Sequence, residues 1–128
     1  MNSLKFTPEK SSCLCGGAEY VVLACSGACD LGQITDSVAR KLRDNGVRKM
    51  NCLATIGAGL GKPFGQLKKN NILMLDGCPV DCGKKILDDA GFTGYKYMRI
   101  TDLGYKKGET PVTDQVINDV YEKVEIIY

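Results

Sequence analysis

Short apolar runs recur along the chain and predict the strands of a sheet. They are rich in β-branched and aliphatic residues. The runs lie at residues 20–25, 50–56, 72–75 and 97–101. The first and third are apolar almost throughout, which is typical of strands that are buried on both faces of a parallel sheet. The fourth has the poorest apolar pattern.

Other segments have apolar residues at every third or fourth position, as on one face of an amphipathic helix. The clearest segment follows Asp30, which can cap a helix, and stops before Gly46, which can end one. Its apolar face would consist of Leu31, Ile34, Val38 and Leu42. Pro79 suits the first turn of a helix, and Thr113 is suited to cap one. Further helices are predicted at 64–69, 79–90 and 113–124.

Strands that alternate with helices predict an α/β fold with a parallel sheet and right-handed crossovers. The length of 128 residues fits one domain. We expect a single three-layer α/β/α (Rossmann-like) domain with a parallel sheet of about four strands in the order 2-1-3-4. This order lets the first three strands end side by side. Residues 1–18 are expected to form an irregular N-terminal arm, and residues 19–128 the domain.

Charge and hydropathy exclude several classes of protein. The chain has 17 Lys and Arg against 15 Asp and Glu, a formal net charge of +2, which gives no support for binding of nucleic acid. No apolar stretch is long enough for a transmembrane helix, so no membrane partner is expected. The first ten residues lack the apolar core of a secretion signal. We therefore expect a cytoplasmic protein.

Cysteine is abundant and histidine is absent. The chain has seven Cys and no His. An odd number of thiols in a reducing compartment argues against a complete disulfide framework. Any metal site must be built from thiolates, with or without carboxylates. The absence of His also removes the usual Ser–His and Cys–His catalytic pairs, and no dinucleotide fingerprint is present. A conventional hydrolase or oxidoreductase is therefore not expected.

Cysteines occur where the predicted strands end. Cys25 ends the first strand, Cys52 lies in the second, and Cys78 follows the third. Cys82 is expected one helical turn beyond Cys78 on the same face, and Cys29 forms a second C-x₃-C pair with Cys25. Sites in α/β sheets form beyond the carboxyl ends of the strands. Structural zinc ions are commonly bound by four thiolates. The alternative is that each Cys is a small, buried apolar residue.

The turn at residues 76–82 reads Asp-Gly-Cys-Pro-Val-Asp-Cys, and it resembles the signature of the DGC-domain family. Segments 24–27, 52–59 and 101–104 also match, in the family's order. Members of that family are described as zinc-binding because of four potential chelating cysteines. The resemblance implies that zinc is the cofactor and that its ligands here are Cys25, Cys52, Cys78 and Cys82. The family has a small residue other than cysteine at the position of Cys29, so Cys29 is an additional thiol here. Either Cys29 or Cys52 can therefore supply the fourth ligand.

The acidic and tyrosine residues around this turn are predicted to have structural roles. Asp76 and Asp81 are interpreted as a helix cap and a solvated helix start, with support of a metal ligand as the alternative role for Asp76. Tyr95, Tyr97 and Tyr105 are interpreted as packing at the edge of the sheet.

Three hypotheses of function follow. The first is a zinc-binding protein whose partner is a metal ion. The second is a thiol-redox or sulfur-transfer protein, in which Cys29 is a free thiol and Cys13 and Cys15 resolve a disulfide or relay sulfur. The third is an iron–sulfur protein. A structural zinc would not need Cys13, Cys15 or Cys29, so we favour handling of metal or sulfur, with a protein partner or a second copy as recipient.

Overall fold

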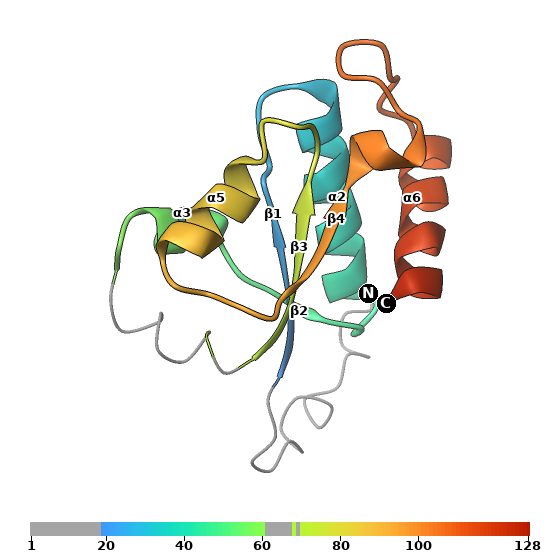
Figure 1. The fold of residues 1–128 in the computed structure, drawn as a ribbon. Coiled ribbons are helices and arrows are strands. Elements are labelled where there is room, and N and C mark those ends of the chain that lie inside the picture. The colour runs from blue at the N-terminus through green and yellow to red at the C-terminus, as the bar shows by residue number, and fades with distance from the viewer. Residues whose placement is uncertain (1–18, 61–67, 69) are drawn as a thin grey trace.

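The structure is a computed structural model that describes residues 19–60, 68 and 70–128 (Figure 1). The expected arm at 1–18, with Cys13 and Cys15, lies outside the described residues, as does nearly all of the helix expected at 64–69. In chain order the elements are β1 (Tyr20–Ala24), α2 (Asp30–Asp44), β2 (Lys49–Met50), α3 (Leu53–Gly57), β3 (Asn71–Asp76), α5 (Cys82–Asp89), β4 (Lys96–Arg99), the 3₁₀ helix η2 (Ile100–Leu103) and α6 (Asp114–Ile127).

The four described strands form one parallel sheet in the order β2-β1-β3-β4. The predicted α/β class, three layers and strand order are thus confirmed. β1 and β3 pair along their full length from Tyr20 opposite Asn71 to Ala24 opposite Leu75. In Figure 1, α2 and α6 cover one face of the sheet, and α3 and α5 cover the other.

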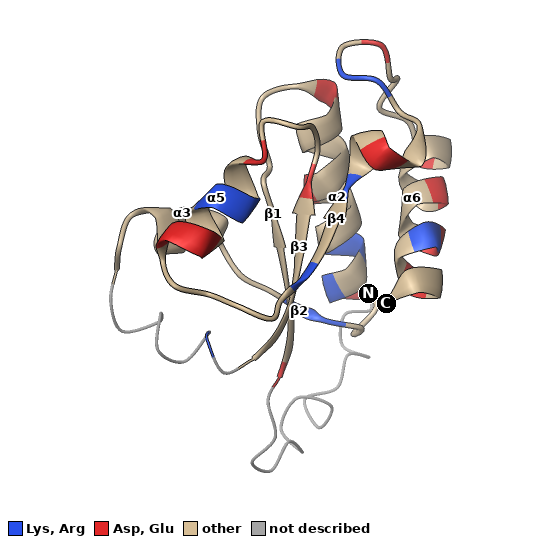
Figure 2. Cartoon of the chain, in the orientation of Figure 1, with Lys and Arg blue, Asp and Glu red and all other residues tan. Residues whose placement is uncertain are grey.

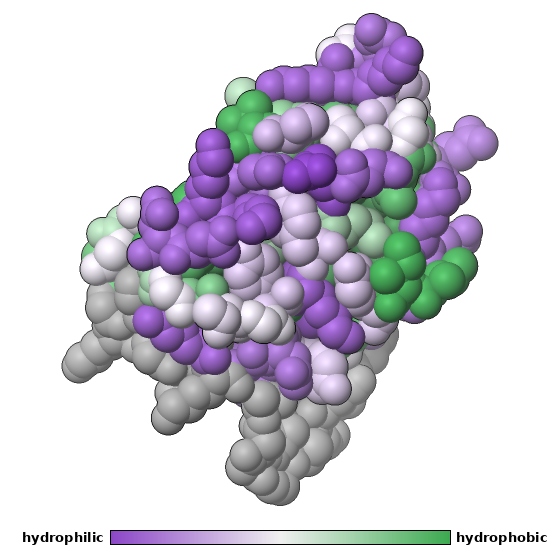
Figure 3. All heavy atoms as spheres, in the orientation of Figure 1, coloured by the Kyte–Doolittle hydropathy of each residue, from purple (hydrophilic) through white to green (hydrophobic). Residues whose placement is uncertain are grey.

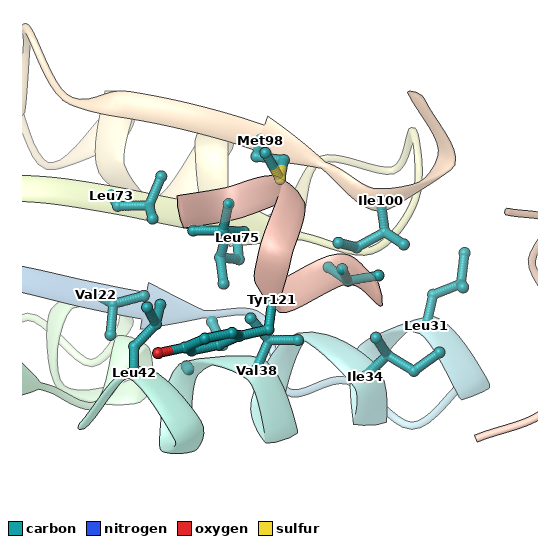
Figure 4. Close-up of a cluster of buried hydrophobic side chains, with 14 residues drawn as sticks. Val22, Leu31, Ile34, Val38, Leu42, Leu73, Leu75, Met98, Ile100 and Tyr121 are labelled. Carbon is teal, nitrogen blue, oxygen red and sulfur yellow. The ribbon is translucent and has the colours of Figure 1, made fainter. Parts of the chain in front are cut away.

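Alternate residues of the central strands enter different layers of the core, as the side-chain period of two requires. Val22 and Leu73 pack with α2 and α6, as Figure 4 shows. Val21 and Ile72 pack on the other face with α3 and α5. Because both faces are covered, β1 and the interior of β3 are apolar throughout, which explains the continuous runs in the sequence.

The second predicted strand, at 50–56, is wrong after its first residue. β2 ends at Met50, and α3 begins at Leu53, so Cys52 is the N-cap of a short helix rather than a strand residue. Leu53 and Ile56 lie three positions apart and are both buried in the core layer of α3 and α5. A short apolar run fits either a strand or a buried helical turn, and here the burial of these two side chains decides for the helix.

The helix expected from residue 79 begins only at Cys82, because Asp81 before it has φ 59° and ψ 40°, in the left-handed region. The chain therefore cannot run as a right-handed helix through the turn at 78–81. Pro79 consequently lies outside the helix, and Cys78 does not share a helical face with Cys82. The fourth strand likewise ends at Arg99, and the residues after it form η2.

Two helix caps were also predicted. Thr113 caps α6 as expected, because its hydroxyl accepts a hydrogen bond from the Val116 N–H at 3.2 Å. The cap of α2 is different: Cys29 occupies the N-cap position, and Asp30 is the first helical residue. In the part of the chain that the structure describes, no helix combines the length and apolar character needed to cross a membrane.

Candidate functional site

Five cysteines lie in loops and helix starts at the carboxyl ends of the strands. Cys25 directly follows β1, and Cys29 is the N-cap of α2. Cys52 is the N-cap of α3, Cys78 follows β3, and Cys82 is the first residue of α5. All five are free thiols; Cys52 and Cys82 are exposed, and the others are half-buried. The topology thus collects the described cysteines at the sheet edge where α/β folds place their sites.

The described conformation does not gather these thiols into a cage. Cys29 and Cys78 pack against the core layer of α2 and α6, and the Cys25 Sγ lies 3.4 Å from the Thr35 Oγ1. Over residues 19–60, 68 and 70–128, no three Cys, Asp or Glu side chains form a group that could hold a metal ion. The donor set suits zinc chemically, but its present geometry does not, so the predicted ligand set stays a prediction.

Asp76 of the DGC turn is a buried helix cap. Its carboxylate accepts hydrogen bonds from the backbone N–H groups of Gly83 at 2.9 Å and Lys84 at 3.0 Å. The Tyr97 hydroxyl donates a third hydrogen bond to it at 2.8 Å. Asp76 therefore caps α5 through its side chain, although Asp81 occupies the N-cap position itself, and these first free amides of α5 serve the carboxylate rather than a thiol.

Asp81 is not a solvated helix start. The Arg99 Nε and Nη2 donate parallel hydrogen bonds to its two carboxylate oxygens, each at 2.8 Å, and the Tyr97 hydroxyl approaches at 2.9 Å. Arg99 is the main cause that lowers the pKa of Asp81. A bidentate pair of this kind fixes orientation as well as charge.

Tyr97 links the two aspartates of the motif. Its hydroxyl has one hydrogen for two acceptors, the carboxylates of Asp76 and Asp81. Burial raises the pKa of Tyr97 most, and the two carboxylates raise it further. The sequence pattern around Tyr97 indicates only packing at the edge of the sheet, and nothing in it marks Arg99. Both residues follow the motif by many positions, so no local pattern marks them.

The loop after β1 is held by a second set of polar contacts. The Ser26 hydroxyl donates to Asp36 at 2.8 Å, and Asp36 pairs with Arg40 at 2.7 Å. The Ser26 N–H also lies 3.4 Å from the Thr35 hydroxyl. Burial raises the pKa of Asp36, but the hydrogen bonds from Arg40 and Ser26 lower it below its ordinary value. Asp36 is the main cause that raises the pKa of Arg40, and Cys52 is the smallest of the contributors.

Glycines allow close contacts at the start of α2, both with the loop after β1 and with the DGC turn. A Cβ at position 32 would lie 2.5 Å from the Gly27 carbonyl oxygen. A Cβ at position 77 would lie 2.9 Å from the Leu31 Cβ and 3.2 Å from the Gly32 nitrogen. The glycine of the DGC turn is therefore needed for close packing of this turn on the start of α2.

Residues 104–112 form a further loop beside the cysteines, and Asp30 anchors it. The Asp30 carboxylate accepts hydrogen bonds from the backbone N–H groups of Gly108 and Thr110, both at 3.0 Å. These two bonds are the largest causes that lower the pKa of Asp30. Figure 2 shows basic and acidic residues close together in this loop.

Exposed apolar side chains occur at both ends of the sheet. The face drawn in Figure 3 is mostly hydrophilic, with smaller apolar patches. Ile126 and Ile127 lie at the end of α6, and Val80 lies in the turn between Cys78 and Cys82. The cysteine edge thus carries an exposed apolar side chain among its polar ones.

The comparisons with known proteins concern this same part of the chain. The model of the DGC domain matches residues 21–124. The chain is similar to the "Anaerobic and virulence modulator AnvM" of Pseudomonas aeruginosa, with 28% identity over 88 residues, which are 68% of this chain and 67% of that protein. No solved structure matches. The segment matched by the domain model contains all five described cysteines.

Proposed function

The chain belongs to the DGC domain family, and we propose that it is a zinc-binding protein whose thiolates at the carboxyl edge of the sheet hold the metal. The proposed ligands are Cys25, Cys52, Cys78 and Cys82, with Cys29 as the rival to Cys52. Bound zinc would tie together the loops that follow three strands.

One observation carries the proposal: contacts within the fold account for the acidic residues and the glycine of the turn at 76–82, but they give its thiols no hydrogen-bond partner among the described residues. Asp76 caps α5, and Asp81 pairs with Arg99. Gly77 permits close packing on α2. By contrast, Cys78 contributes only packing against the core layer of α2 and α6, and the exposed Cys82 makes no side-chain hydrogen bond among the described residues. Thiols without a hydrogen-bond partner are available for a ligand.

Metal binding would require the loops to rearrange, because no three ligands are grouped in the described residues. The thiols lie after the strands and at helix starts, so the loops can move without breaking the pairing of β1 with β3. Loops at the carboxyl ends of the strands are the usual place for such movement in α/β proteins, because the sheet beneath them stays fixed.

The test is the metal content of the purified, reduced full chain, measured by elemental analysis. We expect about one zinc ion per chain, and strong loss of zinc in Cys78→Ser and Cys82→Ser. Cys13→Ser is the matched control and should retain the metal. Titration of reactive thiols before and after chelation should reveal about four protected thiols. Equal metal content in all these variants would overturn the ligand assignment.

A second candidate is a thiol-redox or sulfur-transfer protein. It is favoured by the exposure of Cys52 and Cys82 together with the lack of a three-ligand group in the described chain. A metal-free preparation that forms and releases a specific disulfide, identified by mass spectrometry, would support it. A brown preparation would instead indicate an iron–sulfur cluster. Free thiols fit the proposed cytoplasmic location, and a protein partner or a second copy would receive the metal or sulfur.

A further inference from the structure

Two residues beside the thiols have an unusual backbone conformation. Among the described residues, Ser26 with φ 49° and Asp81 with φ 59° are the positive-φ residues other than glycine. Ser26 directly follows Cys25, and Asp81 directly precedes Cys82. Residues other than glycine rarely adopt this region, and those that do cluster at functional loops that the surroundings hold in place.

Each of the two residues is held by its own ion pair. Ser26 donates to Asp36, which pairs with Arg40 of the same helix. Asp81 is held by Arg99 from β4 through two hydrogen bonds. We call these the Asp36 lock and the Arg99 lock. They share no residue, so each can act on its own loop.

Each lock also holds the backbone next to a half-buried thiol. The Asp81 N–H donates to the Cys78 carbonyl at 3.1 Å and closes the turn that holds Cys78 against the core. In the other loop, the Thr35 hydroxyl lies 3.4 Å from both the Cys25 Sγ and the Ser26 nitrogen. Freeing Asp81 or Ser26 would therefore loosen the segment that shields Cys78 or Cys25.

We propose that Asp81 and Ser26 are positioning residues, and that the Arg99 lock and the Asp36 lock separately restrict access to the Cys78 and Cys25 thiols. The inference rests on the proposed function only in treating these thiols as functional groups. Two independent locks would hold the loops in the ungrouped arrangement of the described residues, and release of each would free one thiol for its ligand.

The test is the alkylation rate of each thiol by iodoacetamide, followed by mass spectrometry on the reduced, chelated full chain. Arg99→Gln should speed alkylation of Cys78 at least about fivefold, while the rate at Cys25 stays within about twofold. Asp36→Asn should do the reverse. Because the protein is metal-free, failure of the zinc proposal would leave this result unaffected.

Three further variants make the result decisive. Arg43→Gln breaks an exposed ion pair with Asp44 on α2 and should change neither rate. Asp81→Gly keeps the left-handed backbone accessible but removes the carboxylate, so it should also speed alkylation of Cys78. Tyr97→Phe removes the hydrogen bonds to both Asp81 and Asp76 and should give a smaller change of the same kind, even if Arg99→Gln fails to fold. Equal acceleration of both thiols in each lock variant, or of neither, would overturn the proposal.

Discussion

The Asp76 carboxylate at the end of β3 accepts a hydrogen bond at 2.9 Å from the backbone N–H of Gly83 in α5. This bond spans the turn that carries Cys78 and Cys82. The approach requires glycine, because a Cβ at position 83 would lie 2.7 Å from the Asp76 Oδ1 and 2.2 Å from the Met74 Cε. Strand and helix thus fix the two ends of the turn, whatever its thiols bind.

Loss of this carboxylate should destabilise the fold. Asp76→Ala leaves the N–H groups of Gly83 and Lys84 without their acceptor in a buried place, while the Tyr97 hydroxyl keeps Asp81 as its acceptor. We expect the free energy of unfolding to fall by about 2–3 kcal/mol, measured by urea denaturation. Asp76→Asn keeps the shape and one acceptor and should lose less. A change below about 0.5 kcal/mol in the alanine variant would contradict the capping role.

The packing of the loop after β1 on the start of α2 can be tested with a pair of glycines. Gly32→Ala would place a methyl group 2.5–2.7 Å from backbone atoms of Gly27, which cannot move aside as a side chain can. We expect a loss of about 1–3 kcal/mol in the free energy of unfolding. Gly27→Ala is the control, because a Cβ there meets nothing within 4 Å. Equal stability of the two variants would show that the loop after β1 does not pack on α2 at Gly32.

Acid stability should depend on Asp119 of α6. The Tyr105 hydroxyl and then Lys123 lower the pKa of Asp119 below its ordinary value of 3.8. A lowered carboxyl pKa stabilises the folded state fully above pH 3.8, and the contribution is lost as the pH falls through the folded pKa. Tyr105→Phe should therefore lower the free energy of unfolding at pH 7 and reduce its fall between about pH 5 and pH 2.

The matched control for this pH dependence is Tyr128→Phe. The Tyr128 hydroxyl donates to the Tyr97 carbonyl at 2.8 Å, so its loss removes a hydrogen bond without changing a carboxylate. Unfolding curves at several pH values should give parallel profiles for this variant and the wild type. The same acid-side slope in Tyr105→Phe as in the wild type would contradict the assigned role of Asp119.

The strands that define the sheet were predictable because their burial leaves a local mark. The runs at 20–25 and 72–75 are apolar at every position, since helices cover both faces of the sheet. The cysteines after β1 and β3 then follow from topology alone, because parallel strands end at one edge. The run around Cys52 carries no such mark: its apolar residues fit a strand or a helical turn equally well.

The conformation of the DGC turn was not predictable from local pattern. Pro79 and the following residues are compatible with a helix start, and only the pairing of Asp81 with Arg99 shows where the chain turns away. Arg99 belongs to β4, and the 18 positions that separate it from Asp81 correspond to no helix or strand repeat. The grouping of thiols depends on such contacts, which is why strand order alone could not decide it.

The most direct measurement of zinc binding by these thiols is X-ray absorption at the zinc edge on the zinc-loaded full chain. The proposed site predicts about four sulfur neighbours at about 2.3 Å from the metal. Loss of one sulfur neighbour or of the metal is expected in Cys82→Ser. A shell of oxygen neighbours at about 2.0–2.2 Å without sulfur, or the absence of bound zinc under reducing conditions, would contradict the proposed function.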